Sequence, residues 1–168
     1  GSNLIIGGLG NDILNGDSGT DTASYETAGT GVTVNLLLAG AQNTVGAGTD
    51  TLSNFENLKG SNFNDTLTGN AGNNTLTGSL GNDTLSGGTG VDSFIFNTTL
   101  NATTNKDTIT DFVPVDDTLV LENAIFTKFT ANGAIPGGTF VSGAGAVAAD
   151  ANDFLLYDTN TGTLSYDA

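Results

Sequence analysis

Acidic and amide side chains recur at every ninth position in the middle of the chain. They are Asp65, Asn74, Asp83 and Asp92. Carboxylate and amide oxygens at a fixed spacing suit a hard cation, which takes about six to eight oxygen ligands at roughly 2.4 Å. The chain has no His and no Cys, so the commonest general base and the thiol nucleophile are both absent. The pattern therefore indicates metal binding rather than acid–base or nucleophilic chemistry.

These side chains belong to a nonapeptide repeat that runs from Gly60 to Ile95. Its four rows are GSNFNDTLT, GNAGNNTLT, GSLGNDTLS and GGTGVDSFI. Position one is always glycine, position four is glycine in three rows, and position eight is always leucine or phenylalanine. Glycine at positions one and four is expected to allow tight turns with positive φ. The acid or amide at position six therefore sits at the end of a turn.

A second block of the same repeat lies near the start of the chain. Its rows, GGLGNDILN and GDSGTDTAS, span residues 7–24 and place Asp12 and Asp21 at position six. Residues 51–59 lack the glycines but keep an acid, Glu56, in the same column. The repeat frame therefore extends well upstream of its most regular part.

Each row predicts one turn followed by one short strand, because positions seven to nine have strand chemistry. Alternation along a strand turns only position eight inward. Two successive rows then form one coil whose strands lie in opposite sheets, and strands of successive coils stack at about 4.8 Å. The expected fold is all-β: a right-handed parallel β-roll, or β-solenoid, with a C-terminal β-rich cap.

Turns two rows apart are stacked neighbours in such a roll. This places Asp65 beside Asp83 on one side and Asn74 beside Asp92 on the other. Two carboxylates at that spacing repel each other strongly unless a cation lies between them. Backbone carbonyls of the glycine-rich turns add oxygens, and such a cage fits calcium better than magnesium, which needs a smaller octahedron. Further candidate pairs of the same spacing are Asp83 with Asn101, Asn3 with Asp21, and Glu56 with Asn74.

Composition limits the possible partners. The chain carries 3 lysines against 18 acids, a formal net charge of −15, whereas affinity for nucleic acid comes from basic side chains that neutralise phosphates. It has no apolar run long enough to span a membrane, so membrane insertion is not expected. Acidic chains with few aromatics are often disordered. Here the apolar residues recur at regular spacing, so we expect disorder only in the metal-free chain.

The rows resemble the repeats-in-toxin (RTX) family, whose nonapeptide G-G-x-G-x-D-x-apolar-x binds calcium. Residues 87–95 match this pattern fully, and residues 7–14 match it as far as they extend. The resemblance implies several bound calcium ions and export through a type I secretion machinery. It also implies a location that is secreted, extracellular or on the cell surface of a Gram-negative bacterium.

The resemblance continues beyond the repeats. Residues 107–112 (DTITDF) and 116–121 (DDTLVL) resemble the capping segment that follows the roll in such proteins. Residues 154–158 and 163–167 are similar to a hairpin near the C-terminus of type I secreted proteins, where the export signal lies. Position-six side chains, turn glycines and one residue of the capping segment form the expected metal-ligating set: Asp65, Asp83, Asp92, Asn74, Gly72, Gly81, Gly88, Gly90, Asp12, Asp21 and Asp111.

Two regions are expected. Residues 1–96 form the calcium-binding β-roll, with repeat blocks at 1–24 and 51–95 separated by an insert. The insert, residues 25–50, is predicted to be an irregular coil or side hairpin of the same solenoid. Residues 97–168 form the cap and a secretion-associated β region in which the export signal is expected to be truncated.

Three functions remain open from the sequence. The first is a non-catalytic calcium module that folds outside the cell and serves the secretion and structure of a larger, adhesin-like protein. The second is an accessory fragment of a secreted enzyme, because family members include proteases, lipases and epimerases; the chain itself is not expected to be an enzyme. The third is an ice-binding surface made by the outward threonines of the repeat strands, Thr66, Thr68, Thr84, Thr75 and Thr77, with Ser86.

Overall fold

The computed structural model describes residues 1–99, 101, 103–126, 140–143, 155–158, 160 and 163–166. Each nonapeptide row forms one turn and one short strand, as the sequence predicts. The strands of the four rows are β8 (Thr66–Thr68), β9 (Thr75–Thr77), β10 (Thr84–Ser86) and β11 (Ser93–Phe96). Successive strands lie in opposite sheets, so β8 pairs with β10, and β9 with β11, both in parallel.

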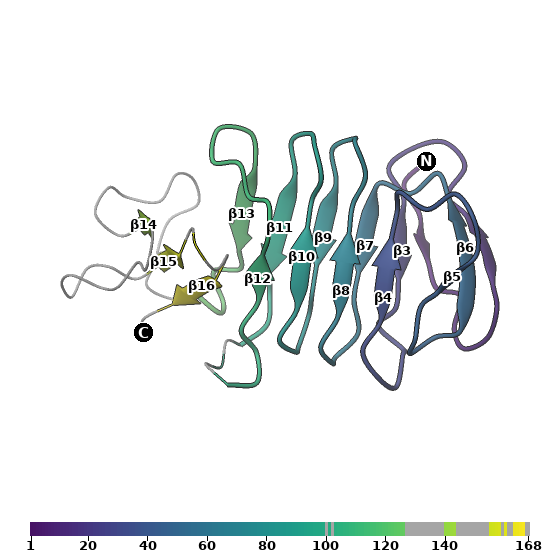
Figure 1. Ribbon diagram of the computed structural model, residues 1–168, viewed down its shortest axis with the longest axis horizontal. Coiled ribbons are helices and arrows are strands. Elements are labelled where there is room, and N and C mark those ends of the chain that lie inside the picture. The colour runs from purple at the N-terminus through teal and green to yellow at the C-terminus, as the bar shows by residue number, and fades with distance from the viewer. Residues whose placement is uncertain are drawn as a thin grey trace.

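Two long sheets run along the molecule (Figure 1). The first is parallel throughout. Its order is β1 (Leu4–Ile5), β3 (Thr22–Ser24), β7 (Asn57–Lys59), β9, β11 and β13 (Thr118–Leu121). Parallel pairing therefore continues past residue 96, as far as β13. The division into roll and cap at that residue stays a prediction.

The second sheet has a parallel part and an end of mixed direction. The parallel part is β4 (Thr33–Asn35), β8, β10 and β12 (Thr108–Ile109). At the far end lie β16 (Thr163–Tyr166), β15 (Leu155–Asp158) and β14 (Phe140–Gly143). β15 and β16 pair antiparallel, so the hairpin predicted there is present. The rest of the region after residue 126 lies outside the described residues.

The insert contributes strands to the second long sheet and to a small third sheet. Its strand β4 joins the roll beside β8. A small third sheet contains β2 (Ile13–Asn15), β6 (Thr49–Ser53) and β5 (Gln42–Asn43), with β2 and β6 parallel and β5 and β6 antiparallel. The insert is thus partly a coil of the roll and partly a side hairpin.

The core is a cluster of apolar side chains between the sheets. At position eight, Leu67, Leu76, Leu85 and Phe94 are fully buried, because alternation points only that residue inward. Burying one leucine contributes about 1.5–3 kcal/mol, and each row of the repeat adds one such side chain. None of the described residues is helical, and no helix long and apolar enough to cross a membrane occurs among them. The architecture is an all-β parallel β-roll.

Candidate metal centre

Position-six carboxylates form a ladder along one side of the roll. The backbone N–H of Val32 donates to Asp65 Oδ1 at 2.7 Å, and the N–H of Asp65 donates to Asp83 Oδ1 at 2.8 Å. The N–H of Asp83 donates in turn to Asp107 Oδ1 at 3.1 Å. The side chain at position six therefore reaches across the gap to the same position of the preceding coil. The predicted stacking of Asp65 and Asp83 is present.

The partner predicted above Asp83 was wrong. Asn101 forms a bridge with Asn105 within one loop, and Asp107 takes the place expected for Asn101. The coil between β10 and β12 is longer than a nonapeptide coil, because Thr84 pairs with Thr108. Extra residues in the loop shift the next position-six acid along the chain without changing the strand register.

A second ladder runs along the opposite side. Asp21 Oδ1 accepts from the N–H of Asn3 at 2.7 Å, and Glu56 Oε2 accepts from the N–H of Asp21 at 2.8 Å. Asp92 Oδ1 accepts from the N–H of Asn74 at 2.8 Å. Glu56 therefore serves as the position-six acid of a turn that lacks the glycines.

Asn74 departs from the acids of its ladder. Its Nδ2 donates to the carbonyl of Glu56 at 2.6 Å, and its Oδ1 accepts from the N–H of Asn70 at 2.7 Å. The amide thus supplies a donor where an aspartate would present only acceptors. This turn therefore depends less on a bound cation than the neighbouring turns do.

Several of the ladder carboxylates are buried. Asp21, Asp83 and Asp92 have exposed fractions of 0–1 %. Burial, followed by the nearby carboxylates of Asp107 and Asp65, raises the pKa of Asp83 to about 8. Burial likewise raises the pKa of Asp107 to about 6 and the pKa values of Asp65 and Asp92. The chain alone does not stabilise these groups as anions.

Several buried carboxylate oxygens lack a hydrogen-bond donor. Among the described residues they are Asp12 Oδ2, Asp21 Oδ2 and Asp83 Oδ2. Buried polar atoms are normally paired, and a buried charge without a partner is strongly unfavourable. A divalent cation beside these oxygens would supply the missing partner, so the residues present fit calcium.

Carboxylates alone do not make a complete cage. Within the described part of the chain, acidic side chains do not gather in groups of three or more that could hold a metal ion. Backbone carbonyls are therefore further candidate ligands. The carbonyls of Phe63 and Gly72 point toward the next coil, where a Cβ added to Gly81 or Gly90 would lie 2.5 or 2.7 Å from them. Such carbonyls face the gaps between stacked turns.

The glycines of positions one and four have different roles. At position four, Gly81 and Gly90 have φ of 128° and 132°, which favours glycine, whereas Gly72 is not among the residues with positive φ. Glycine at position one was predicted to allow turns with positive φ, but none of the position-one glycines of residues 60–95 has positive φ. There the backbone lies against the position-six side chain, so a Cβ at Gly78 would collide with Asp83 Oδ2.

The other predicted ligands lie at different places in the turns. Asp12 is stacked on Asp50, whose Oδ1 accepts from the N–H of Asp12 at 3.1 Å. Gly88 has φ of 100° and donates its N–H to Asp111 Oδ2 at 2.9 Å. Asp111 also accepts from the N–H of Gly87 at 3.0 Å. Asp111 therefore lies against the turn of the fourth row but outside the ladder. Metal ligation by any of these residues stays a prediction.

Three ladder acids were missed from the sequence: Asp50, Asp107 and Asp117. Asp107 and Asp117 do not follow glycine-rich turns, whereas Asp50 follows Gly46 and Gly48 and lies two residues after the second of these, as a position-six acid does. The signal that identifies them is an aspartate followed by threonine and an apolar residue. Asp50-Thr51-Leu52 shares it with Asp83-Thr84-Leu85 of the repeat.

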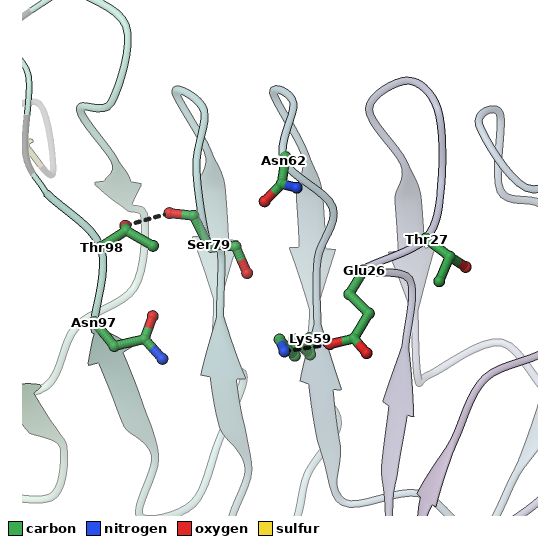
Figure 2. A pocket seen from close by; sticks show the side chains of 7 residues that line it. All are labelled: Glu26, Thr27, Lys59, Asn62, Ser79, Asn97 and Thr98. Carbon is green, nitrogen blue, oxygen red and sulfur yellow. Dashed lines mark hydrogen bonds and ion pairs between the residues drawn. The ribbon is translucent and has the colours of Figure 1, made fainter.

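A polar groove of about 530 Å³ lies beside the first- and third-row turns, where Asn62 and Ser79 line it (Figure 2). It contains an ion pair between Lys59 Nζ and Glu26 Oε2, and Thr98 Oγ1 donates to the carbonyl of Ser79 at 2.6 Å. Its other lining residues are Thr27 and Asn97. The groove has no aromatic wall for a sugar, and its one lysine and one glutamate are already paired.

Comparison with protein families identifies the repeat. A family described as the RTX calcium-binding nonapeptide repeat matches the chain in four copies, over residues 1–23 and 59–94. No curated protein matches the chain significantly. The matched residues contain the turns of Asp12, Asp21, Asp65, Asp83 and Asp92.

Proposed function

Because residues 1–23 and 59–94 are RTX calcium-binding nonapeptide repeats, we propose that this chain is a calcium-dependent folding module of a larger type I secreted protein. Its role is structural: it becomes ordered in calcium outside the cell and supports the export and architecture of an adhesin-like surface protein. The observation that carries the proposal is Asp83, which is 1 % exposed and has an Oδ2 without a donor.

The chemistry of the turns favours calcium over magnesium. Each turn offers one position-six side chain and several carbonyls, a mixed oxygen set of flexible geometry. Calcium accepts such a set, whereas magnesium requires a smaller, stricter octahedron and releases its waters reluctantly. We therefore expect magnesium to fold the chain only at much higher concentration.

The expected affinity supports folding outside the cell. Extracellular calcium modules have dissociation constants of about 0.1–1 mM. At about ten times its dissociation constant, one site adds about 1.4 kcal/mol to the free energy of unfolding. A few stacked sites then approach the total stability of a small domain, about 5–15 kcal/mol. Several weak sites can therefore decide whether the roll folds.

The test compares the chain in chelator with the chain in millimolar calcium. Circular dichroism and small-angle scattering should show an expanded, disordered chain in chelator and a compact, β-rich one in calcium. A parallel titration with magnesium should give a clearly higher midpoint. The same compact state in chelator and in calcium would falsify the proposal, and equal midpoints for the two ions would remove its calcium specificity.

The repeat module itself is structural rather than catalytic. If the parent protein is a protease, a lipase or an epimerase, we place its catalytic groups in another part of that protein. The described groove around Lys59 supports this placement, because its two charged groups are occupied by each other. An assay of this chain alone should therefore find no hydrolysis or epimerisation.

An ice-binding surface is the second candidate, and one observation favours it. Thr33, Thr66, Thr84 and Thr108 pair in register across four neighbouring strands. The first three of these side chains are exposed, so they form a regular rank of hydroxyl and methyl groups at about 4.8 Å spacing. A thermal-hysteresis measurement on the calcium-loaded chain tests this candidate. Freezing-point depression equal to that of buffer would exclude it.

A further inference from the structure

The carboxyl groups of Asp83 and Asp107 are buried and face each other. They lie where the matched repeats end on that side of the roll. Asp83 belongs to the third row, and Asp107 follows the last matched residue, 94. Their exposed fractions are 1 % and 6 %, and the two groups lie within hydrogen-bonding reach. Ionised carboxylates are acceptors only, so neither supplies the donor that Asp83 Oδ2 lacks.

The loop that carries Asp107 reproduces the ladder geometry without the repeat sequence. Strand β12 pairs with β10 in the same register as β10 with β8, with Ile109 beside Leu85 and Leu85 beside Leu67. The N–H of Asp83 donates to Asp107 Oδ1 at 3.1 Å, matching the 2.8 Å bond from Asp65 to Asp83. The third-row turn is therefore covered on both faces by stacked acids.

An asparagine of this loop bonds to the third-row turn. Asn105 is 4 % exposed, and its Oδ1 accepts from the N–H of Gly81 at 2.8 Å. Its Nδ2 donates to the carbonyl of Thr99 at 2.7 Å. The Asn105 side chain thus links this loop to the third-row turn by hydrogen bonds. Of the two facing carboxyl groups, that of Asp83 keeps a buried oxygen, Oδ2, without a donor.

We propose that the gap between Asp83 and Asp107 is a calcium site that extends the ion array one coil past the nonapeptide repeats. A divalent cation there neutralises both anions and contacts the donor-less Oδ2 of Asp83. The inference rests on the proposed function, because it concerns a further ion of the same kind, calcium. It adds a ligand, Asp107, that the repeat pattern does not contain.

Terbium, a luminescent and anomalously scattering substitute for calcium, is the direct probe. Crystals of the full chain grown in terbium should show an anomalous peak within coordination distance of both carboxyl groups. A map that has peaks at the repeat turns and none between Asp83 and Asp107 overturns this inference and leaves the proposed function standing. A chain that folds without any divalent ion overturns both.

A solution measurement complements the crystals. Calcium bound per chain, measured by equilibrium dialysis at about 1 mM free calcium, should fall by about one ion in Asp107→Asn. The matched control Asp116→Asn removes an equal charge from an exposed side chain and should bind as many ions as the wild type. An unchanged count and midpoint in Asp107→Asn contradicts the inference. If that variant does not fold, the terbium map decides.

Discussion

Asp83 and Asp50 are both ladder carboxylates with an exposed fraction of 1 %, yet they are stabilised differently. Asp50, at the end of the insert, accepts hydrogen bonds from Tyr25 Oη at 3.2 Å and Thr44 Oγ1 at 3.1 Å. Asp83, in the repeat, has no donor at Oδ2. A buried carboxylate can thus be stabilised by hydroxyl groups of the chain or by an added cation.

This difference explains why folding of the repeat is expected to depend on calcium. Tyr25 and Thr44 belong to the insert, which is long enough to bring hydroxyl groups over Asp50. In the third row no donor reaches Asp83 Oδ2, whereas in the first row Ser61 Oγ donates to Asp65 Oδ1 at 2.7 Å. The stabilisation of the Asp83 carboxylate therefore depends on a cation from the solution rather than on hydroxyl groups of the chain.

Gly78→Ala should have the largest effect on the repeat side of this comparison. A Cβ at residue 78 collides with Asp83 Oδ2 and approaches the Asp83 Cβ at 3.0 Å, so the carboxyl group cannot keep its place. We expect the calcium midpoint for folding, followed by circular dichroism, to rise at least tenfold. Gly40→Ala is the control, because an added Cβ there meets no atom within 4 Å. Equal midpoints for the two variants would show that the close approach at position one is unimportant.

Asp83→Ala should raise the calcium midpoint severalfold and lower the cooperativity of the titration. The substitution removes an anion between two other acids, Asp65 and Asp107, so two gaps lose a ligand. Asp116→Ala, which truncates an exposed acid, should change neither quantity. If both alanine variants titrate alike, net charge rather than the ladder determines calcium affinity.

Acid should partly replace calcium in the metal-free chain. The folded-state pKa values of Asp83, about 8, and Asp107, about 6, lie above their ordinary value of 3.8. The folded state therefore binds extra protons between about pH 4 and pH 8, and its stability falls as the pH rises through that window. Residual β content without metal should be higher at pH 5 than at pH 8. The double variant Asp83→Asn, Asp107→Asn should lose most of this dependence, and an unchanged profile would assign it to other acids.

How much of this could be predicted from sequence depended on the signal used. The column of glycines and acids gave the parallel roll, the stacking of Asp65 with Asp83 and the buried position-eight residues. It missed Asp107 and Asp117, because these acids follow loops of other lengths and only the strand register restores their place. It also could not show that Tyr25 lies over Asp50, since that contact joins residues 25 apart and no local pattern encodes it.

Tyr25→Phe tests the insert side of the comparison. The change removes the hydroxyl donor to Asp50 and keeps the ring in the core. A hydrogen bond to a charged group contributes about 1.5–3 kcal/mol, so urea unfolding should show a loss of this size at each of two saturating calcium concentrations. The number of bound ions should not change. A loss that vanishes at higher calcium would mean that Asp50, like Asp83, relies on a cation.

Asn74→Asp should have the smallest effect. It tests whether folding of the repeat can be made more dependent on calcium. Asn74 is 2 % exposed and stabilises its own turn by donating to the carbonyl of Glu56. Aspartate cannot donate, so the metal-free turn becomes less stable, while the added charge beside Asp92 strengthens cation binding. We expect a modestly lower calcium midpoint together with less residual structure in chelator.

Asn62→Asp is the matched control for this last change, because it adds the same charge at an exposed position of the first-row turn. It should leave the midpoint and the residual structure near the wild-type values. A higher midpoint in Asn74→Asp at unchanged ion count would mean that the amide serves Glu56 alone and that no cation enters this gap. The second ladder would then resemble the insert, with one turn stabilised by the chain itself between turns that depend on calcium.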